Sequence, residues 1–543
     1  MDATMMNTQL TIDGLMDRAE QYFGDVEVVS QMPDKSLRRD TYADIGERSR
    51  RLAKGLQERG LEPGECVATL MWNHYAHLET YFGAPMAGGI YHTLNIRLSP
   101  DDLTYIVDNA EDRYLIVDDV LLPLLQKFVD RIEVDEIFVV RMTDEPLPDG
   151  FTDYEELLAD EVGDWQPPEL DENQGAGLCY TSGTTGKPKG VVYDHRSLVL
   201  HSLGSAMADT LAVTSNDTVL PVVPMFHANA WGLPFTCTMT GAKQVFPGPH
   251  LDGESLLDLY DREEVTMTAG VPTIWLDIVQ QLEKNPDGWE IHDGMRMVVG
   301  GAAPPRSLIE KFDEFDMEVV HAWGMTETTP LGTVSTLRPA HQDLSYDQKL
   351  DIRAKQGAAV PLFDLRAVDE EGNEVPWDGE TAGELQVRGP WVADSYVSGR
   401  DADKWDEDNW FSTGDVVTID EHGYIKITDR LKDVIKSGGE WISSQELENT
   451  LMAHPDVAEA AVFAVPHPKW SERPMAAVVL KEGRTVDDDE LNEMLLEKYP
   501  KFWLPEEYVE MEEIPRTSTG KFQKSDLRSQ FSDWKPGEAI EEG

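Results

Sequence analysis

The first third of the chain alternates between helical and strand-like patterns of apolar residues. Apolar positions recur on one face of a helix predicted over residues 41–59, and Gly60 ends it. The apolar run 66–71 predicts a strand, 77–87 a second helix and 114–117 a second strand. Strands that alternate with helices are typical of a parallel, doubly wound sheet.

An acidic stretch that contains prolines, residues 144–174, interrupts this alternation. Strand-like apolar runs resume after it, at 219–223, 266–271, 297–300 and 318–321. The pattern therefore predicts two doubly wound α/β subdomains that are joined at the acidic stretch.

The period of the apolar pattern shortens toward two residues in the next part of the chain. Alternation over 383–389 and a hairpin pattern over 416–428 predict a small, β-barrel-like subdomain at about 360–430. With the two α/β subdomains it makes up a large N-terminal domain, predicted over 1–430.

A compact α+β domain is predicted over the remaining residues, 434–543. Its helix, two strands and second helix are expected at 444–453, 460–462, 476–479 and 487–499. The predicted fold class is therefore α/β, with a small α+β C-terminal domain.

Composition and charge limit the possible partners. Of the 543 residues, 41% are hydrophobic and 8% aromatic, which is enough apolar surface for several folded domains. Asp and Glu number 102 against 46 Lys and Arg, so the formal net charge is −56, and nucleic acid is disfavoured as a partner. A pI of about 4.4 indicates a halophile-type protein from a salt-rich cytoplasm. An ordinary acidic mesophilic enzyme is the alternative.

Cysteine content and the absence of targeting patterns suggest a reducing compartment. Cys66, Cys179 and Cys237 are too few for a disulfide framework, and no pair has metal-ligand spacing. No signal-peptide pattern opens the chain, and no apolar run reaches the ~20 residues needed to cross a bilayer. We therefore expect a cytoplasmic protein without a transmembrane segment.

A loop rich in glycine, hydroxyl and lysine side chains, YTSGTTGKPKG at 180–190, follows the apolar strand 176–179. Such a loop suits a polyphosphate, because glycines let backbone N–H groups turn toward an anion and hydroxyls and lysines add donors. It is not a Walker loop, since Thr181 stands where that pattern needs glycine and Pro188 blocks a following helix. A plain surface loop is the alternative. The candidate ligands are Thr181, Ser182, Gly183, Thr184, Thr185, Gly186 and Lys187.

Lysines are scarce in this acidic chain, and several cluster in short segments rich in Gly, Ser or Thr. These lysines are Lys187, Lys189, Lys432, Lys436, Lys521 and Lys524. Cations kept in such a chain are interpreted as phosphate-binding groups.

The loop resembles the phosphate loop of the adenylate-forming (AMP-binding) superfamily, which includes acyl-CoA synthetases, adenylation domains and luciferases. Further signatures of that superfamily follow in order along nearly the whole chain. They are PMFH at 224–227, GGAAP at 300–304, WGMTE at 323–327, STGD at 412–415, DRLKD at 429–433 and PRTSTGK at 515–521. The resemblance implies activation of a carboxylate by ATP.

The resemblance implies roles for the residues around the phosphates. An attacking carboxylate builds charge on the phosphate oxygens, which needs cations nearby. Glu327 is the expected Mg²⁺ ligand, with the hydroxyl of Thr181 as partner, and Thr326 is expected to bind the α-phosphate. A glutamate that caps a helix is the alternative for Glu327.

The nucleoside is expected to bind to the later signatures. Trp323 stands where many relatives have Tyr, and it is expected to stack on adenine, with a plain core residue as the alternative. The other residues expected near the adenine are Gly300, Gly301, Ala302, His321 and Ala322. Asp415 is expected to bind the ribose hydroxyls with support from Arg430, although a strand-end Asp can also be a turn residue.

The C-terminal signatures imply a mobile domain. Lys521 resembles the lysine that bridges the carboxylate and the α-phosphate, whereas Lys524 is interpreted as a solvated side chain. Lys432 matches a hinge at 431–433, where rotation presents another face for the second half-reaction. Lys436 and Trp441 are expected to reach the nucleotide. The residues expected to line the tunnel for the thiol are Ser437, Gly438, Gly439 and Glu440.

The acid is expected to bind at 225–232, which is nearly all apolar around His227. His227 is expected to face the carboxylate, with a buried structural histidine as the alternative. Trp231 is similar to the gating tryptophan of the fatty acyl branch. The segment contains no Arg or Lys for a polar tail, so an alkyl chain fits best, with each buried methylene worth ~0.8 kcal/mol.

The sequence therefore predicts an ATP-dependent medium- to long-chain fatty acid–CoA ligase that uses ATP, coenzyme A and Mg²⁺. A CoA ligase for aryl or short branched acids is the first alternative, and a luciferase-like oxygenase or a non-catalytic sensor is disfavoured. Coenzyme A as acceptor rests on the resemblance and on the short chain after Lys521, which leaves no room for a fused carrier domain, although a free carrier protein stays open. A homodimer is a family-level expectation.

Overall fold

The computed structural model describes residues 3–181, 187–437, 440–481, 483–516, 522–532 and 534–535. The chain divides into two compact units. The first comprises Met1–Thr181, Pro188–Asp364 and Arg388–Phe411, and the second contains Leu365–Val387 and Ser412–Gly543. The domain boundaries at 430 and 434 stay a prediction.

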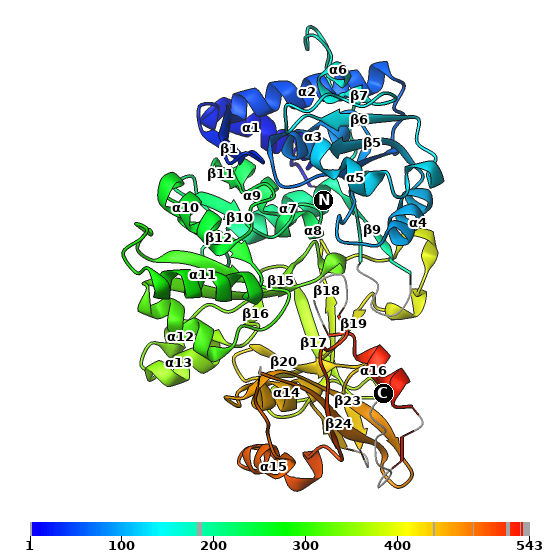
Figure 1. Ribbon diagram of the computed structural model, residues 1–543. Coiled ribbons are helices and arrows are strands. Elements are labelled where there is room, and N and C mark those ends of the chain that lie inside the picture. Colours follow the sequence, from blue (N-terminus) through cyan, green and yellow to red (C-terminus); the bar gives the residue numbers. More distant parts are fainter. Residues whose placement is uncertain are drawn as a thin grey trace. The chain divides into compact units, whose positions relative to one another are not determined.

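The first unit contains two α/β sheets (Figure 1). One has the strand order β7-β6-β5-β3-β4-β8-β9. Its strands are β3 (Cys66–Leu70), β4 (Ile90–Thr93), β5 (Asp112–Asp118), β6 (Glu136–Val140), β7 (Thr152–Asp153), β8 (Gly175–Tyr180) and β9 (Gly190–Asp194). All neighbours pair in parallel except β8 and β9, which are antiparallel.

The other sheet has the order β16-β15-β14-β13-β12-β10-β11-β1-β2. Its strands are β1 (Glu27–Gln31), β2 (Leu37–Thr41), β10 (Thr218–Pro221), β11 (Lys243–Phe246), β12 (Met267–Gly270), β13 (Met295–Val299), β14 (Met317–Gly324), β15 (Leu331–Val334) and β16 (Ala358–Ala359). Its centre is parallel and both of its edges are antiparallel.

The division at the acidic stretch is wrong for the strands. The hairpin β1–β2 precedes that stretch but belongs to the second sheet, whereas β8 and β9 follow it and belong to the first. The acidic stretch itself contributes β7 to the first sheet. Strand partners are chosen by long-range pairing, which a local apolar pattern does not record.

The α-helices of the first unit lie mostly between consecutive strands along the chain. They are α1 (Asp13–Phe23), α2 (Tyr42–Glu58), α3 (Tyr75–Met86), α4 (Pro100–Ala110), α5 (Leu122–Leu125), α6 (Tyr154–Leu157), α7 (His195–Ala206), α8 (Ala228–Trp231), α9 (Leu233–Thr240), α10 (Gly253–Glu263), α11 (Pro272–Lys284), α12 (Arg306–Glu314) and α13 (Tyr346–Arg353). The predicted helix at 41–59 is confirmed as α2, which begins where Thr41 and Asp44 form a capping box. Helix α12 packs between α11 and α13 (Figure 1).

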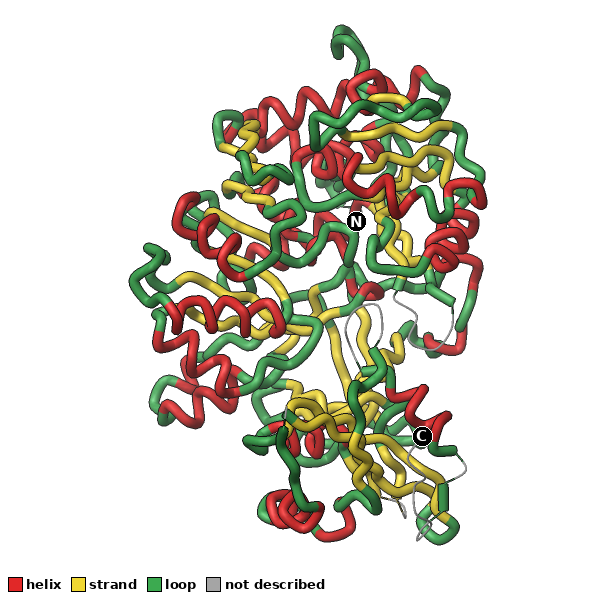
Figure 2. Tube along the Cα trace, in the orientation of Figure 1, coloured by secondary structure: helices red, strands yellow, loops and turns green. Residues whose placement is uncertain are grey.

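The second unit is rich in strands, coloured yellow in Figure 2. One sheet has the order β17 (Asp364–Val368), β18 (Gly383–Arg388), β19 (Phe411–Ile419), β20 (Ile425–Arg430). The other has the order β22 (Glu440–Ile442), β21 (Ile435–Ser437), β24 (Ser471–Leu480), β23 (Val457–His467), and β25 (Tyr508–Glu510) pairs with β24. Its helices are α14 (Ser444–Met452), α15 (Asp488–Leu496) and α16 (Lys524–Gln530).

The strand β23 is longer than the predicted 460–462 because both of its faces are buried. Val457 and Val462 pack into one apolar cluster, and Phe463 and Val465 pack into another on the opposite face. Among the helices of the described ranges, none combines the length and hydrophobicity that a bilayer crossing needs.

Candidate active site

The phosphate loop connects two antiparallel strands of the first sheet. Strand β8 ends at Tyr180, and the chain returns as β9 at Gly190. At the base of the loop, the N–H of Thr181 donates to the carbonyl of Lys189 at 2.9 Å, and the N–H of Lys189 donates to the Thr181 hydroxyl at 3.3 Å. The predicted ligands Ser182, Gly183, Thr184, Thr185 and Gly186 lie outside the described residues, and Lys187 is exposed.

Several of the clustered lysines have carboxylate partners. Lys189 forms an ion pair with Asp401, and Lys436 forms one with Glu370 at 2.6 Å. An acidic chain offers its lysines many carboxylate partners, so lysine scarcity alone does not identify phosphate ligands.

Lys524 is buried, so its interpretation as a solvated side chain is wrong. Only 9% of it is exposed, and its Nζ contacts Glu448 and the hydroxyl of Ser444, each at 2.7 Å. The backbone N–H and hydroxyl of Ser444 both donate to Asp429 at 2.6 Å. Burial raises the pKa of Glu448 to about 7, although Lys524 opposes the shift.

Glu327 is held in a short turn that follows β14. Its carboxylate Oε1 accepts a hydrogen bond from the hydroxyl of Tyr396 at 2.5 Å, and its carbonyl accepts one from the N–H of Ala393 at 2.8 Å. The neighbouring Thr326 is also buried, and its carbonyl accepts a hydrogen bond from the hydroxyl of Tyr193 at 2.8 Å. Both predicted phosphate-side residues are therefore fixed in place.

Trp231 lies against Gly300. This contact brings the predicted acid-binding segment next to the predicted adenine-binding segment. A Cβ at Gly300 would lie only 2.9 Å from Cη2 of the Trp231 indole. The indole reaches this position from a left-handed turn, in which α8 has φ values of 44° to 57°. Four non-glycine residues in this conformation are strained, which is a frequent property of functional segments. Gly232, at φ 73°, ends the turn, and His227 begins it.

Asn73 forms hydrogen bonds that fix the segment leading to His227. The sequence did not predict this role. Its side-chain amide donates to the carbonyls of Pro221 and Val223 at 3.0 Å each, and its Oδ1 accepts the N–H of Met225 at 2.7 Å. The hydroxyl of Tyr81 donates to the carbonyl of Met225 at 2.5 Å. A buried Asn shortly after strand β3 was the available signal, since buried polar groups need partners.

The predicted adenine residues divide into buried and exposed members. Trp323 is 6% exposed and packs edge to face on Phe363, with 6.4 Å between ring centroids. His321 is buried, and desolvation lowers its pKa to about 4, which keeps its ring neutral near pH 7. Ala322 is also buried, whereas Gly301 and Ala302 are exposed.

Asp415 and Arg430 are paired in the second unit. They stand opposite each other on β19 and β20, and the Nε of Arg430 lies 2.7 Å from Oδ1 of Asp415. Asp415 is 1% exposed, whereas the side chain of Arg430 is 43% exposed. Close to the predicted hinge, burial lowers the pKa of Lys432.

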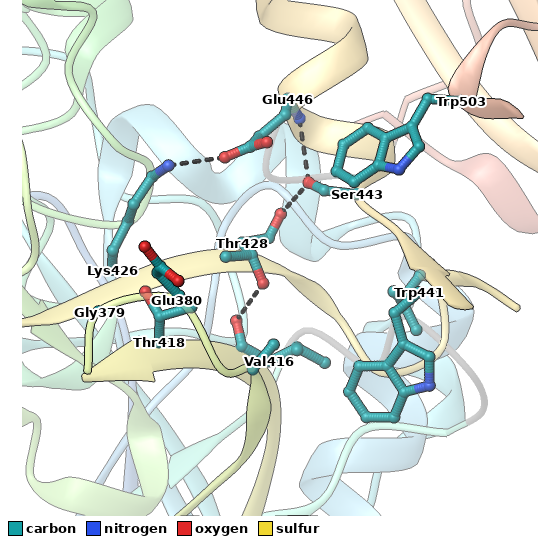
Figure 3. Close-up of a pocket in the computed structure, with 12 residues that line it drawn as sticks. Gly379, Glu380, Val416, Thr418, Lys426, Thr428, Trp441, Ser443, Glu446 and Trp503 are labelled. Carbon is teal, nitrogen blue, oxygen red and sulfur yellow. Dashed lines mark hydrogen bonds and ion pairs between the residues drawn. The ribbon is translucent and has the colours of Figure 1, made fainter. Parts of the chain in front are cut away.

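A cavity of about 230 Å³ lies in the second unit between residues that precede and follow the predicted hinge (Figure 3). Trp441 and Trp503 form part of its wall, and Lys426 and Glu446 form an ion pair at 2.6 Å at another part. The Nζ of Lys436 lies 5.5 Å from the ring centroid of Trp441.

The remaining predicted residues of the C-terminal domain are only partly described. Ser437 is buried, and its hydroxyl accepts a hydrogen bond from Arg473 at 3.3 Å. Gly438, Gly439, Lys521 and the side chain of Glu440 lie outside the described residues.

Two family models match the chain. The model for AMP-binding enzymes matches residues 15–397, and the model for the C-terminal domain of AMP-binding enzymes matches residues 446–521. The chain belongs to the AMP-binding enzyme family. The expected superfamily membership is thereby confirmed.

The chain is similar over nearly its whole length to several curated CoA ligases. It is 48% identical to a long-chain-fatty-acid–CoA ligase of Thermus thermophilus, and the match covers 98% of each chain. It is 45% identical to a 3-methylmercaptopropionyl-CoA ligase of Ruegeria pomeroyi, over 97% of this chain and 98% of the relative. It is 42% identical to a medium-chain-fatty-acid–CoA ligase of Ectopseudomonas oleovorans, over 97% of each.

The residues predicted to hold Mg²⁺ have side chains of the kind that this ion prefers. Glu327 and Thr181 offer oxygen atoms, which Mg²⁺ prefers. Within the described ranges there is no group of three or more His, Cys, Asp or Glu residues able to hold a metal. Mg²⁺ often binds through one or two carboxylates together with substrate phosphates. A site with only one protein carboxylate, that of Glu327, is therefore compatible with Mg²⁺.

Proposed function

We propose that the protein is an ATP-dependent medium- to long-chain fatty acid–CoA ligase. The acid and ATP give acyl-AMP and pyrophosphate, and the thiol of coenzyme A then displaces AMP. The observation that carries the proposal is the 48% identity over 98% of the chain to a long-chain-fatty-acid–CoA ligase. The packing of Trp231 on Gly300 supports it, because the predicted acid and adenine segments lie together.

The first half-reaction uses the phosphate-side residues. The loop at 181–187 binds the phosphates, Thr326 orients the α-phosphate, and Glu327 with Thr181 would hold Mg²⁺. That ion supplies positive charge to the phosphate oxygens. Lys521 approaches the carboxylate and the α-phosphate, where charge develops in the transition state.

The nucleoside binds along the remaining signatures. Adenine lies by Trp323 and the segment of Gly300, Gly301, Ala302, His321 and Ala322. Asp415 accepts hydrogen bonds from the ribose hydroxyls, and its pairing with Arg430 supports this role because it fixes the carboxylate.

The acid binds along the segment that runs from His227 to Trp231. His227 faces the carboxylate, and the alkyl chain lies along apolar side chains. Support comes from the clamp of Asn73 and Tyr81, which fixes the backbone immediately before His227.

The second half-reaction uses the C-terminal domain over 434–543. Rotation at Lys432, in the hinge 431–433, presents Ser437, Gly438, Gly439 and Glu440 to the pantetheine arm of coenzyme A. Lys436 and Trp441 reach the nucleotide in this scheme, and their mutual contact supports a shared role.

A second candidate substrate is a short thioether acid. The 45% identity to a 3-methylmercaptopropionyl-CoA ligase favours it, because the similarity is close to that for the fatty acid ligases. Both substrates use the same chemistry and differ in the length of the apolar chain.

The test is pyrophosphate release from ATP and Mg²⁺ across a panel of acids, measured in molar KCl with and without coenzyme A. The panel runs from acetate and 3-methylmercaptopropionate through medium and long fatty acids to benzoate. We expect a peak at medium or long alkyl chains and turnover that depends on coenzyme A. A peak at the thioether acid or at benzoate would contradict the fatty acid assignment, and no release with any acid would contradict the ligase.

The role of Lys521 has a matched control. Lys521→Ala is expected to reduce acyl-AMP formation by orders of magnitude while thioester formation from supplied acyl-AMP continues. Lys498→Ala removes an exposed lysine of the same domain and is expected to change neither step. Equal loss in both half-reactions of K521A would contradict the assigned role.

The proposal also includes a homodimer in a salt-rich cytoplasm. We expect the protein to need high salt for activity and stability. The net charge of −56 supports this, because dissolved salt screens the repulsion between carboxylates. Activity and stability in a KCl series test it, and full retention of both after desalting would contradict it. Light scattering in molar KCl tests the dimer.

A further inference from the structure

Tyr396 contacts the carboxylate of Glu327 and belongs to none of the motifs described above. It is 5% exposed, and its hydroxyl donates to Oε1 of Glu327 at 2.5 Å. A short hydrogen bond from a neutral hydroxyl to a carboxylate is among the stronger and more directional kinds. It sets the rotation of the carboxylate group about its last bond.

The ring of Tyr396 is itself held on two sides. Trp405 packs against it edge to face, with 5.3 Å between ring centroids. The Nζ of Lys189 lies 5.1 Å from the ring centroid, and the same ammonium forms an ion pair with Asp401. Lys189 stands at the end of the phosphate loop, where its backbone pairs with Thr181.

The backbone of Glu327 is attached to the same segment as its side chain. The N–H of Ala393 donates to the Glu327 carbonyl at 2.8 Å, and the carbonyl of Ala393 accepts the indole N–H of Trp405 at 2.6 Å. Residues 393–405 therefore hold both the main chain and the carboxylate of Glu327, and they contact the end of the phosphate loop through Lys189.

We propose that Tyr396 is a positioning residue for Glu327, which orients the carboxylate toward the magnesium–ATP complex before the nucleotide binds. The proposal rests on the proposed function, in which Glu327 is a Mg²⁺ ligand. Groups that orient metal ligands typically change metal affinity or activity 10- to 100-fold when they are removed. The effect is expected in the Mg²⁺ dependence, because Tyr396 has no assigned contact with ATP.

The main test is Tyr396→Phe, which removes the hydroxyl and keeps the ring between Trp405 and Lys189. Its matched control is Tyr260→Phe, which removes a buried hydroxyl from a contact with Thr268 at 3.1 Å, in a core cluster of the same unit. Asp401→Asn is a second test variant, since it removes an exposed partner of Lys189 and leaves the core intact.

Equilibrium binding of ATP is measured by calorimetry across a Mg²⁺ series and in EDTA, and pyrophosphate release is measured across the same series. We expect Y396F to raise the half-saturating Mg²⁺ concentration about 10- to 100-fold, with ATP binding in EDTA within about twofold of wild type. D401N is expected to raise the half-saturating Mg²⁺ concentration by a smaller factor, and Y260F is expected to leave that concentration unchanged.

An unchanged Mg²⁺ dependence in both Y396F and D401N would overturn the proposal, and so would an equal loss of ATP binding with and without Mg²⁺. The calorimetry separates this inference from the proposed function. Wild-type protein that binds ATP in a Mg²⁺-dependent manner but releases no pyrophosphate with any acid would contradict the ligase, while the variants still decide the role of Tyr396. Wild-type protein without Mg²⁺-dependent ATP binding would overturn both.

Discussion

Replacement of His77 is expected to remove a defined part of the acid sensitivity of the first unit. His77 lies in α3 with no exposed surface. Its Nδ1 faces the carbonyl of Trp72 at 3.0 Å and must donate, so in the neutral ring Nε2 accepts from the hydroxyl of Thr69 at 3.0 Å. Burial is the main cause that lowers the pKa of His77 to about 3, and the nearby His74 adds to it.

The sign and size of the effect follow from the two pKa values. Between pH 6.5 and 3 the unfolded chain binds a proton that folded His77 rejects, so stability is full above pH 6.5 and falls as the pH falls. At pH 5 this difference amounts to about 2 kcal/mol, from a shift of roughly 1.5 pH units below the unfolded pKa.

The variant His77→Gln keeps one donor and one acceptor but does not titrate. Urea unfolding, followed by tryptophan fluorescence at fixed KCl, gives the free energy of unfolding for wild type and variant at pH 7.5 and 5. We expect the stability advantage of wild type to shrink by about 2 kcal/mol at pH 5. His292→Gln, at an exposed position of the same unit, is the control and is expected to give a constant difference. A constant difference for H77Q as well would refute the reasoning.

Three further predictions concern the site and the second unit. Asn73→Ala leaves the N–H of Met225 without its buried acceptor, which costs about 1–3 kcal/mol, and steady-state kinetics are expected to show a higher KM for the acid with little change in the KM for ATP. Gly300→Ala places a methyl group against Trp231, so kcat/KM for the acid is expected to fall about 5- to 150-fold, the equivalent of 1–3 kcal/mol of overpacking; wild-type kinetics would contradict that contact. Lys524→Met removes the cation of a buried ion pair, and a loss of about 3–5 kcal/mol in the free energy of unfolding of the second unit is expected in urea titrations.

The sequence was sufficient for elements with a local signal. The predicted strand 66–71 appears as β3, and the predicted helix 444–453 appears as α14. A buried strand leaves a short apolar run in the sequence, and a helix with one buried face leaves apolar residues at a helical spacing. The pairing of β1 with β11 left no such pattern, since it joins residues more than 200 positions apart. The predicted division of the sheets at the acidic stretch was therefore wrong, because sheet membership depends on such distant pairs.

The same distinction applies to the site. Glu327 and Thr181 could be predicted because each belongs to a motif whose residues are contiguous in the chain. Tyr396 and Asn73 were missed because each acts on a segment far from it in sequence, and a single tyrosine or asparagine carries no local sign of its partner. Lys524 was misinterpreted for the same reason, since its partner Glu448 lies on another element.

The interleaving of the two sheets has a consequence for the newly made chain on the ribosome. The hairpin β1–β2 is complete after about forty residues, but β1 receives its second neighbour only when Lys243–Phe246 has been synthesised. At 5–20 residues per second this interval is roughly 10–40 s, during which one edge of β1 stays open to other nascent chains. The opposite strand β2 carries Arg38 and Arg39, and charged side chains discourage pairing at an outer edge. Chaperone dependence is therefore expected to be greatest before the second sheet closes, and a product truncated at the acidic stretch would keep this edge exposed.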